Sequence, residues 1–469
     1  MHLKRFFTLA ICLMSGILLP LSTSSAAMEV NESNVVELFG KDYIRYEVKK
    51  QETIFSICRR FQVLEEELLA INPFLSEGLK KGQTILIPIR QQANKLDTIA
   101  SKPATELKAK QMESNTTMTV LLPFEVTTQA GANDRYVEFY QGLLLAADTL
   151  KSLGLSFTIQ THSVGEGTSR IQELIDSGVL NRSDYVVGGT HPDQIRLLSA
   201  WAMLNQKNVV LPFSSRIPEM DSNPWLFQTN TTHAHMYERL SEEFIRQYSG
   251  YNIILLKAST NNPSADQTFT SHLRKKFTQK GLSYVDVLEN EDLSGVEAAL
   301  HEDVPNLVVP YQMSMSETIR FVATINSMAN NPLATTTKKI QLFGYPEWQA
   351  LPKRQLQYLY DLNTLIFSNF YADFQRFDLR AFQLNYTKQF GRDMLNTFPK
   401  YAMMGYDIAN WFIPRMIFER GQNAYFKGPK YLQQVFHFKS LQSGGGAFNQ
   451  SFFLIQYKQD LRVEVSELR

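Results

Sequence analysis

Over most of the chain, short apolar runs alternate with longer stretches in which apolar residues recur at helical spacing. The runs predict strands, as at 118–124 and 185–188, and the stretches predict helices, as at 136–150 and 193–205. The alternation restarts after a further apolar segment at 225–229. Because strands that alternate with helices specify a parallel sheet with covering helices, the pattern predicts two such sheets in succession.

The same alternation continues to the end of the chain, where it changes character. Further strands are expected at 157–161, 208–211, 252–257, 283–288, 306–309, 340–343 and 364–367. Further helices are expected at 168–177, 267–280, 295–301, 316–330, 379–390 and 401–419. The tail alternates apolar and polar residues over 451–457 and 461–465, which predicts a terminal hairpin joined by 458–460.

A compact unit near the N-terminus has a pattern of its own. Two short apolar segments, 46–48 and 85–87, predict strands, and two stretches at 54–61 and 65–71 predict helices. Thr53 stands directly before the first helix, where its hydroxyl is suited to an N-cap. The order of these elements is strand, helix, helix, strand, so this unit is expected to fold separately from the rest.

Two segments are expected to lie outside the folded units. Residues 1–27 carry the basic Lys4 and Arg5, then an apolar run, then small residues at 24–27, which is the pattern of a secretory signal that is removed. Residues 90–117 have no aromatic residue and no clean apolar face, so they are expected to form a flexible linker. No stretch after the signal is long and apolar enough to span a bilayer.

Composition and motifs narrow the function by exclusion. The chain has 47 Lys and Arg residues and 46 Asp and Glu residues, so its charges nearly balance. Because binding to nucleic-acid phosphates needs a surplus of basic residues, nucleic acid is not expected as a partner. The only cysteines are Cys12 and Cys58, so the mature chain has no internal disulfide and no cysteine-based zinc site, and Cys58 is expected to be a small buried apolar residue. No HExxH, P-loop or GxSxG motif occurs, and no carboxylate pair suggests glycan hydrolysis. Catalysis, a cofactor and a metal are therefore not expected.

Residues 45–89 resemble the LysM family. The resemblance rests on the following segments: Tyr46-Glu47-Val48, Glu52-Thr53-Ile54, Ile57, Phe61, Val63, Leu68, Asn72-Pro73, Leu79 and Gly82-Gln83-Thr84-Ile85-Leu86-Ile87-Pro88. It implies binding of peptidoglycan or another N-acetylglucosamine polymer, in a groove between two loops formed by Gln51, Glu52, Thr53, Asn72, Pro73 and Leu75. The family's usual Gly-Asp before the Thr is replaced by Gln51-Glu52. A protein-binding or purely structural module is the alternative.

Residues 118–469 resemble type I periplasmic binding proteins, in particular branched-chain amino-acid receptors. The segments that carry the resemblance include 120–123, 139–148, 185–190, 209–214, 224–230, 252–256, 306–310, 342–348, 404–409 and 444–450. The resemblance implies an α/β fold in two lobes, one formed by about 118–230 and 372–425 and the other by about 231–371 and 426–469. It places a ligand in the cleft between the lobes, near Thr190, His191, Ser214, Ser215, Tyr311 and Glu347.

The amino-acid site of those receptors is not reproduced residue by residue. Their carboxylate-binding Ser corresponds to about Pro192, which offers neither a hydroxyl nor an amide hydrogen. The leading hypothesis is therefore an exported, non-catalytic cell-envelope protein, held to the wall by the first unit, whose second unit senses a small molecule or contacts a protein of wall synthesis. The alternative is the substrate-binding protein of an amino-acid-type ABC transporter.

Overall fold

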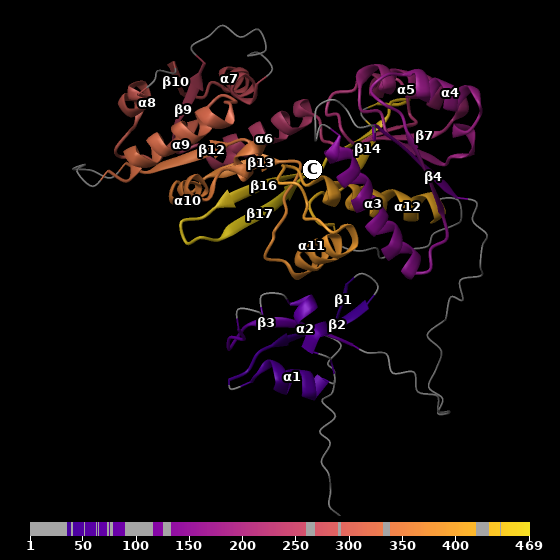
Figure 1. The fold of residues 1–469 in the computed structure, drawn as a ribbon. Coiled ribbons are helices and arrows are strands. Elements are labelled where there is room, and N and C mark those ends of the chain that lie inside the picture. The colour runs from indigo at the N-terminus through magenta and orange to yellow at the C-terminus, as the bar shows by residue number, and fades with distance from the viewer. Residues whose placement is uncertain are drawn as a thin grey trace, which may run out of the picture. The chain divides into compact units, whose positions relative to one another are not determined.

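A computed structural model describes residues 35–38, 41–50, 52–61, 63, 65–72, 75, 78–89, 116–124, 133–258, 268–288, 292–331, 338–418, 431–440 and 442–469 (Figure 1). The expected signal segment, and the expected linker except for its last two residues, lie outside these ranges. The chain forms two compact units that divide after Gln91.

The first unit is a small sheet with two helices. Its elements are β1 (Val35–Leu38), β2 (Lys41–Glu47), α1 (Ile54–Phe61), α2 (Glu65–Ile71) and β3 (Thr84–Pro88). The strands follow the order β1-β2-β3, and β2 pairs antiparallel with β3. Its core contains Ile57, Leu68 and Ile85, all fully buried, together with Cys58, which confirms the expected role of this cysteine. Strand β1 was not expected from the sequence.

The second unit contains two seven-stranded sheets, each the centre of one lobe. The first sheet has the order β14-β15-β8-β7-β6-β4-β5. Its strands are β4 (Thr117–Leu122), β5 (Thr158–Ser163), β6 (Tyr185–Val187), β7 (Asn208–Leu211), β8 (Leu226–Gln228), β14 (Phe438–Ser440) and β15 (Ala447–Asn449). The larger helices of this lobe are α3 (Asp134–Ser152), α4 (Ser169–Asp176), α5 (Pro192–Asn205), α11 (Phe377–Phe390) and α12 (Tyr401–Phe418).

Both faces of this first sheet are buried, which explains its continuous apolar runs. Along β4, Val120 packs in the core formed with α3, α11 and α12, whereas Leu121 packs in the core formed with α4 and α5. Successive side chains of a strand point to opposite faces, so a strand covered on both sides needs apolar residues at every position. All six residues of β4 are accordingly buried.

The second lobe repeats this architecture with an antiparallel edge. Its sheet order is β10-β9-β11-β12-β13-β16-β17, in which β16 pairs antiparallel with both β13 and β17. The strands are β9 (Asn252–Lys257), β10 (Val285–Leu288), β11 (Asn306–Val309), β12 (Ile340–Gly344), β13 (Leu365–Ser368), β16 (Phe452–Tyr457) and β17 (Val463–Leu468). The helices are α6 (His233–Gln247), α7 (Phe269–Lys280), α8 (Ser294–Ala299), α9 (Met315–Ala329) and α10 (Lys353–Asp361).

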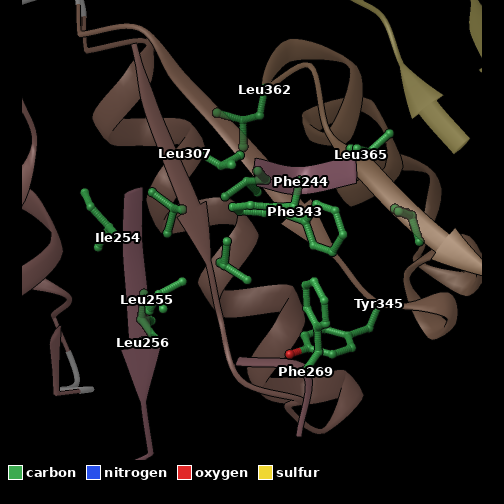
Figure 2. Close-up of a cluster of buried hydrophobic side chains, with 14 of the residues drawn as sticks. Phe244, Ile254, Leu255, Leu256, Phe269, Leu307, Phe343, Tyr345, Leu362 and Leu365 are labelled. Carbon is green, nitrogen blue, oxygen red and sulfur yellow. The ribbon is translucent and has the colours of Figure 1, made fainter. Parts of the chain in front are cut away.

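Aromatic rings fill much of the core of the second lobe (Figure 2). Phe269 of α7 stacks on Phe343 of β12, with ring centroids 5.1 Å apart, and Phe244 of α6 meets Phe343 edge to face at 5.4 Å. All three rings are almost completely buried. These contacts fasten α6 and α7 to the sheet.

The sheet topology changes one expected boundary. Residues 426–469 were expected to belong to the second lobe, but β14 and β15 extend the first sheet, where β15 pairs parallel with β8. The turn before β15 explains this pairing, because the N–H of Gly446 donates to the carbonyl of Met220 at 2.7 Å. A Cβ on Gly446 would lie 2.8 Å from the carbonyl oxygen of Leu226, so only glycine permits this approach. Only β16 and β17 belong to the second lobe.

The chain crosses between the lobes three times, from β8 to α6, from β13 to α11 and from β15 to β16. Buried polar side chains tie these crossings together. The Thr231 hydroxyl in the first crossing donates to the carbonyl of Ser451 in the third at 2.7 Å. The Gln434 amide donates to the carbonyl of Thr229 at 3.0 Å. Because these groups are buried away from water, each hydrogen bond also gives a partner to a polar atom that would otherwise have none.

The buried carboxylate of Asp407 holds the segment 432–434, which contacts the first and the second crossing. Asp407 of α12 is fully buried and accepts the backbone N–H groups of Leu432, Gln433 and Gln434 at 2.7, 2.9 and 2.9 Å. The carbonyl of Gln433 in turn accepts the N–H of Tyr371, in the second crossing, at 2.9 Å. Burial raises the pKa of Asp407 to about 7, although the three N–H groups and Arg376 oppose this rise.

Helices α3 and α12 pack with their backbones almost in contact. A Cβ on Gly405 would lie 1.9 Å from the carbonyl oxygen of Phe139, and a Cβ on Gly142 would lie 1.7 Å from that of Ala402. The buried Glu138 of α3 accepts the N–H of Ala402 at 3.2 Å and so caps the start of α12 from a neighbouring helix. Both glycines are therefore required by this packing and not by a turn.

Replacing Gly405 tests this packing. We expect Gly405→Ala to lower the free energy of unfolding by at least about 2 kcal/mol, because the helices must separate to admit the methyl group. Gly250→Ala is the matched control, since nothing lies within 4 Å of a Cβ there, and it should change stability by less than about 0.5 kcal/mol. Thermal unfolding of the full chain compares the two. Equal stability of both variants would contradict the close approach of α3 and α12.

The pKa of Asp407 predicts a pH dependence of stability. A carboxyl whose pKa rises from 3.8 to about 7 on folding binds its proton more tightly in the folded state. The free energy of unfolding of the wild type, measured relative to that of Asp407→Asn, should therefore fall as the pH rises from 4 to 7, by at most about 1.4 kcal/mol per pH unit. Urea unfolding of both proteins at several pH values measures this difference. A difference that is constant or grows with pH would contradict the proposed titration.

Candidate functional site

A cavity of about 600 Å³ lies between the lobes of the second unit. The first lobe lines it with Ser215, Arg216, Ile217, Pro218, Met220, Asp221, Gln228 and Phe448. The second lobe lines it with Thr232, His233, Ala234, Tyr237, Thr268, His272 and Lys275. Its volume falls within the range of small-molecule sites, and it adjoins the first crossing, which follows β8 directly.

The second-lobe wall consists of two helix N-termini. Thr232 caps α6 by accepting the N–H of His235 at 3.3 Å, and Thr268 caps α7 by accepting the N–H of Ser271 at 3.3 Å. Both threonines line the cavity, so both helices begin at its surface. This arrangement follows locally from the sequence, because threonine in extended conformation is a favoured N-cap.

The first-lobe wall combines apolar and charged groups. Ile217, Met220 and Phe448 are buried residues that present apolar surface to the cavity. Arg216 and Asp221 are exposed and bring one positive and one negative charge. The backbone carbonyl of Ser215 accepts a hydrogen bond from the side-chain amide of Gln228 at 3.1 Å, which holds Ser215 in place.

His272 and Tyr237 are among the titratable side chains of the second lobe that line the same space. Burial lowers the pKa of His272, while Glu238, whose carboxylate lies 3.4 Å from its Nε2, opposes this shift. Burial raises the pKa of Tyr237 to about 12, and the nearby charge of Glu347 adds to this rise. Both groups are therefore uncharged near neutral pH. Within the described ranges, no group of three His, Cys, Asp or Glu side chains is placed to hold a metal ion.

Ser215 is the one residue of the predicted cleft that lines this cavity. The Thr190 hydroxyl instead donates to the side-chain oxygen Oε1 of Gln194, in the first turn of α5, at 3.0 Å. His191 occupies the N-cap position of α5 without a side-chain capping bond. The Ser214 hydroxyl donates to the carbonyl of Arg216 at 3.0 Å, so it shapes the loop before the cavity.

Tyr311 and Glu347, the second-lobe residues of the predicted cleft, also lie outside the cavity lining. Tyr311 follows β11 and packs against the core of the lobe. Glu347 lies in a short 3-10 helix, Pro346–Ala350, and accepts the Gln312 amide at 3.2 Å. Its charge still reaches the cavity, because it raises the pKa of Tyr237.

Sequence reasoning missed the second-lobe residues that do line the cavity. Thr232 and Thr268 carry a readable signal, since each stands directly before a helix. His233 and His235, two residues apart at the start of α6, point to different surroundings. His233 stacks on Tyr237 in the cavity, whereas His235 meets the ring of Phe448 edge to face.

In the first unit, the loop that leads into α1, where the resemblance places one side of the glycan groove, is tightly braced. Glu52 accepts the Tyr46 hydroxyl at 2.7 Å, the Lys49 N–H at 2.8 Å and the Arg60 guanidinium at 2.6 Å. Burial alone would raise the pKa of Glu52, but these three partners outweigh it and lower the pKa. The carboxylate thus fixes the loop that leads into α1. Thr53, by contrast, is exposed and caps α1 by accepting the N–H of Ser56 at 3.1 Å.

The other described residues predicted to bind glycan belong to the core. Asn72 is fully buried, and its amide donates to the carbonyls of Leu68 and Leu86 at 2.8 and 2.7 Å. Its oxygen accepts the Leu86 N–H at 2.8 Å, so Asn72 joins α2 to β3. Leu75 is also buried in this core. Gln51 and Pro73 lie outside the described residues. Thr53 is therefore the exposed residue among the described members of the predicted set.

Asn72→Ala tests the bracing role of this side chain. The change leaves the buried N–H of Leu86 without its partner, so we expect the first unit to lose roughly 1–3 kcal/mol of stability. Lys81→Ala, at an exposed position of the same unit, should have almost no effect. Differential scanning calorimetry of the full chain measures both. An unchanged transition in Asn72→Ala would show that the amide does not hold α2 to β3.

Comparison with known proteins separates the same two parts. The LysM domain family matches residues 46–88, and no curated protein matches the chain. A branched-chain amino acid ABC transporter structure from Rhodospirillum rubrum has 11% identity and a TM-score of 0.53, and the match covers 75% of this chain and 99% of that one.

Two further solved structures match the same share of the chain. A branched-chain amino acid ABC transporter periplasmic ligand-binding protein from Burkholderia xenovorans has 13% identity and a TM-score of 0.48, with coverage of 75% of this chain and 95% of that one. LpoA from Haemophilus influenzae has 13% identity and a TM-score of 0.45, with coverage of 75% and 59%. At these identities a likeness concerns the fold. Residues 46–88 are thus a LysM domain, and the second unit has the type I periplasmic binding protein fold.

Proposed function

We propose that this chain is a non-catalytic binding protein of the bacterial cell envelope. In this proposal the LysM domain attaches the chain to peptidoglycan, and the two-lobed unit binds a ligand between its lobes and reports it to a partner in the envelope. The observation that carries the proposal is the pairing, in one chain, of a LysM domain with a two-lobed unit that has a ligand-sized cavity beside its crossings. The pattern of a secretory signal at 1–27 supports export.

The composition of the cavity favours binding over catalysis. Asp221 is the one carboxylate among the described residues that line it, whereas glycoside hydrolysis uses a pair flanking the scissile bond. The described helices include none long and apolar enough to cross a bilayer.

An amino-acid-type ABC transporter protein is the second candidate, and it draws on the names of the solved structures with the same fold. Such a protein delivers its ligand to a membrane partner. The placement of the predicted cleft residues weakens this candidate, because Thr190, His191, Tyr311 and Glu347 do not line the cavity. A protein that is attached to glycan is also not free to move between the wall and a transporter in the membrane.

The first helix turn of the LysM domain offers a surface for sugar. Phe55 is 70% exposed and lies two residues after the exposed Thr53, in the first turn of α1, which follows the loop braced by Glu52. A flat aromatic face beside a hydroxyl suits a sugar ring, which presents both C–H and O–H groups. These two residues are therefore the contacts that we assign to the glycan.

Sedimentation with purified peptidoglycan sacculi tests the anchoring role. The full chain should pellet with sacculi, and a chain that lacks residues 45–89 should stay in the supernatant. Phe55→Ala should weaken binding several-fold without unfolding, because the side chain is exposed. Leu204→Ala is the matched control, since Leu204 is an equally isolated apolar residue, 84% exposed, in the other unit. Pelleting that persists without residues 45–89 would contradict the proposal.

A further inference from the structure

His235 of α6 stands where two of the three crossings meet. It follows the first crossing directly, and its N–H is accepted by the hydroxyl of the capping Thr232 at 3.3 Å. Its ring meets that of Phe448 in β15 with centroids 5.5 Å apart and that of Phe452 in β16 at 6.5 Å. Phe448 belongs to the first sheet and Phe452 to the second, and the third crossing joins them. One imidazole therefore packs against both lobes where the chain passes between them.

The surroundings of this ring suit its neutral form. The Nε2 atom of His235 is buried and has no hydrogen-bond partner among the described residues. A proton on this atom would add an N–H donor that nothing accepts and a charge that water does not reach. The packing at the crossings therefore depends on an uncharged imidazole.

Two cations near the ring also oppose its protonation. Arg239 lies one turn further along α6, and Lys439 belongs to β14. Burial is the largest cause that lowers the pKa of His235, and these two cations add to it, whereas a hydrogen bond with the backbone of Gln450 acts in the opposite direction.

The carboxylates of the neighbouring elements have cations of their own. Glu467 of β17 accepts the Arg469 guanidinium at 2.8 Å, and it also accepts the hydroxyl of Ser451 in the third crossing. Glu238 of α6 pairs with Lys276 and His272 of α7. A charge on His235 would thus meet carboxylates that are already balanced.

The contact between His235 and Phe448 also adjoins the cavity between the lobes. Phe448 lines this cavity from the first lobe, and Thr232, His233 and Ala234, which directly precede His235, line it from the second. Any change in how His235 packs on Phe448 therefore displaces one wall of the cavity relative to the other.

We propose that His235 is a pH switch: its protonation in acid separates the ring from Phe448, loosens the first and third crossings and alters the cavity. This inference rests on the proposed binding function, because it names a regulation of the same cavity. Each lobe keeps its fold in acid, since the two sheets have separate cores.

Hydrogen–deuterium exchange of the full chain at about pH 7.5 and about pH 5, with labelling times scaled for the intrinsic exchange rates, tests the switch. In the wild type, exchange at 226–236 and 447–453 should rise several-fold in acid, while β4 and β9 stay protected. His235→Phe retains an aromatic ring that cannot take up a proton, so its exchange at both segments should be the same at the two pH values. His437→Gln is the matched control, because His437 is exposed and its carbonyl accepts the N–H of Gln450 beside the same crossing. It should respond as the wild type does.

Urea unfolding gives a second measurement that does not depend on local exchange. A histidine whose pKa is lowered by folding takes up its proton more readily in the unfolded chain, so it costs stability as the pH falls below its ordinary value of 6.5. The equilibrium constant for unfolding of the wild type, relative to that of His235→Phe or His235→Gln, should therefore rise in acid by up to about tenfold per pH unit. His437→Gln should show no such difference from the wild type.

The outcomes separate this inference from the function on which it rests. Exchange at the crossings that does not change with pH in the wild type, or that rises equally in His235→Phe, would overturn the switch. The second result would assign the response to another group, such as Asp407. Neither result bears on pelleting with sacculi, which reports on the anchoring role alone.

Discussion

The connection between the lobes is the constraint on which the second unit depends. Three crossings join two separate cores, and buried polar groups tie them together: the Thr231 hydroxyl bonds the Ser451 carbonyl, and Gln434 bonds the Thr229 carbonyl. Asp407 holds the segment that carries Gln434, through three backbone N–H groups. Buried amides and carboxylates need defined partners, so this network fixes where the chain leaves one lobe and enters the other. The start of α6, and with it one wall of the cavity, follows directly from the first crossing.

Much of the fold could be predicted because burial imposes a simple pattern. Strands covered on both faces, such as β4, appear as unbroken apolar runs, and these runs alternate with helices in the sequence. Elements of three residues, such as β14 and β15, carry too little pattern, and the pairing of β15 with β8 depends on glycine contacts with distant carbonyls. This is why the tail was assigned to one lobe when it serves both.

The candidate sites were harder to predict than the fold, for a physical reason. Asn72 is a polar residue of the kind that contacts ligands, yet its side-chain amide forms hydrogen bonds with the backbone of α2 and β3. Sequence shows which residue types are present but not which polar atoms are already paired. The cavity is built from residues distant in sequence, such as Arg216 and Lys275, and the fold alone brings them together. Only the helix caps, Thr232 and Thr268, carry a local signal.

The central claim is that the chain binds a component of its surroundings and leaves it unchanged. Incubation of the full chain with a soluble digest of peptidoglycan, followed by ultrafiltration and mass spectrometry of the filtrate and the denatured protein fraction, tests this claim directly. The account predicts that specific components disappear from the filtrate and are recovered from the protein with their masses unaltered. New products that accumulate with time would show catalysis, and a filtrate identical to the starting digest would show that the chain binds none of them; either result would contradict the account.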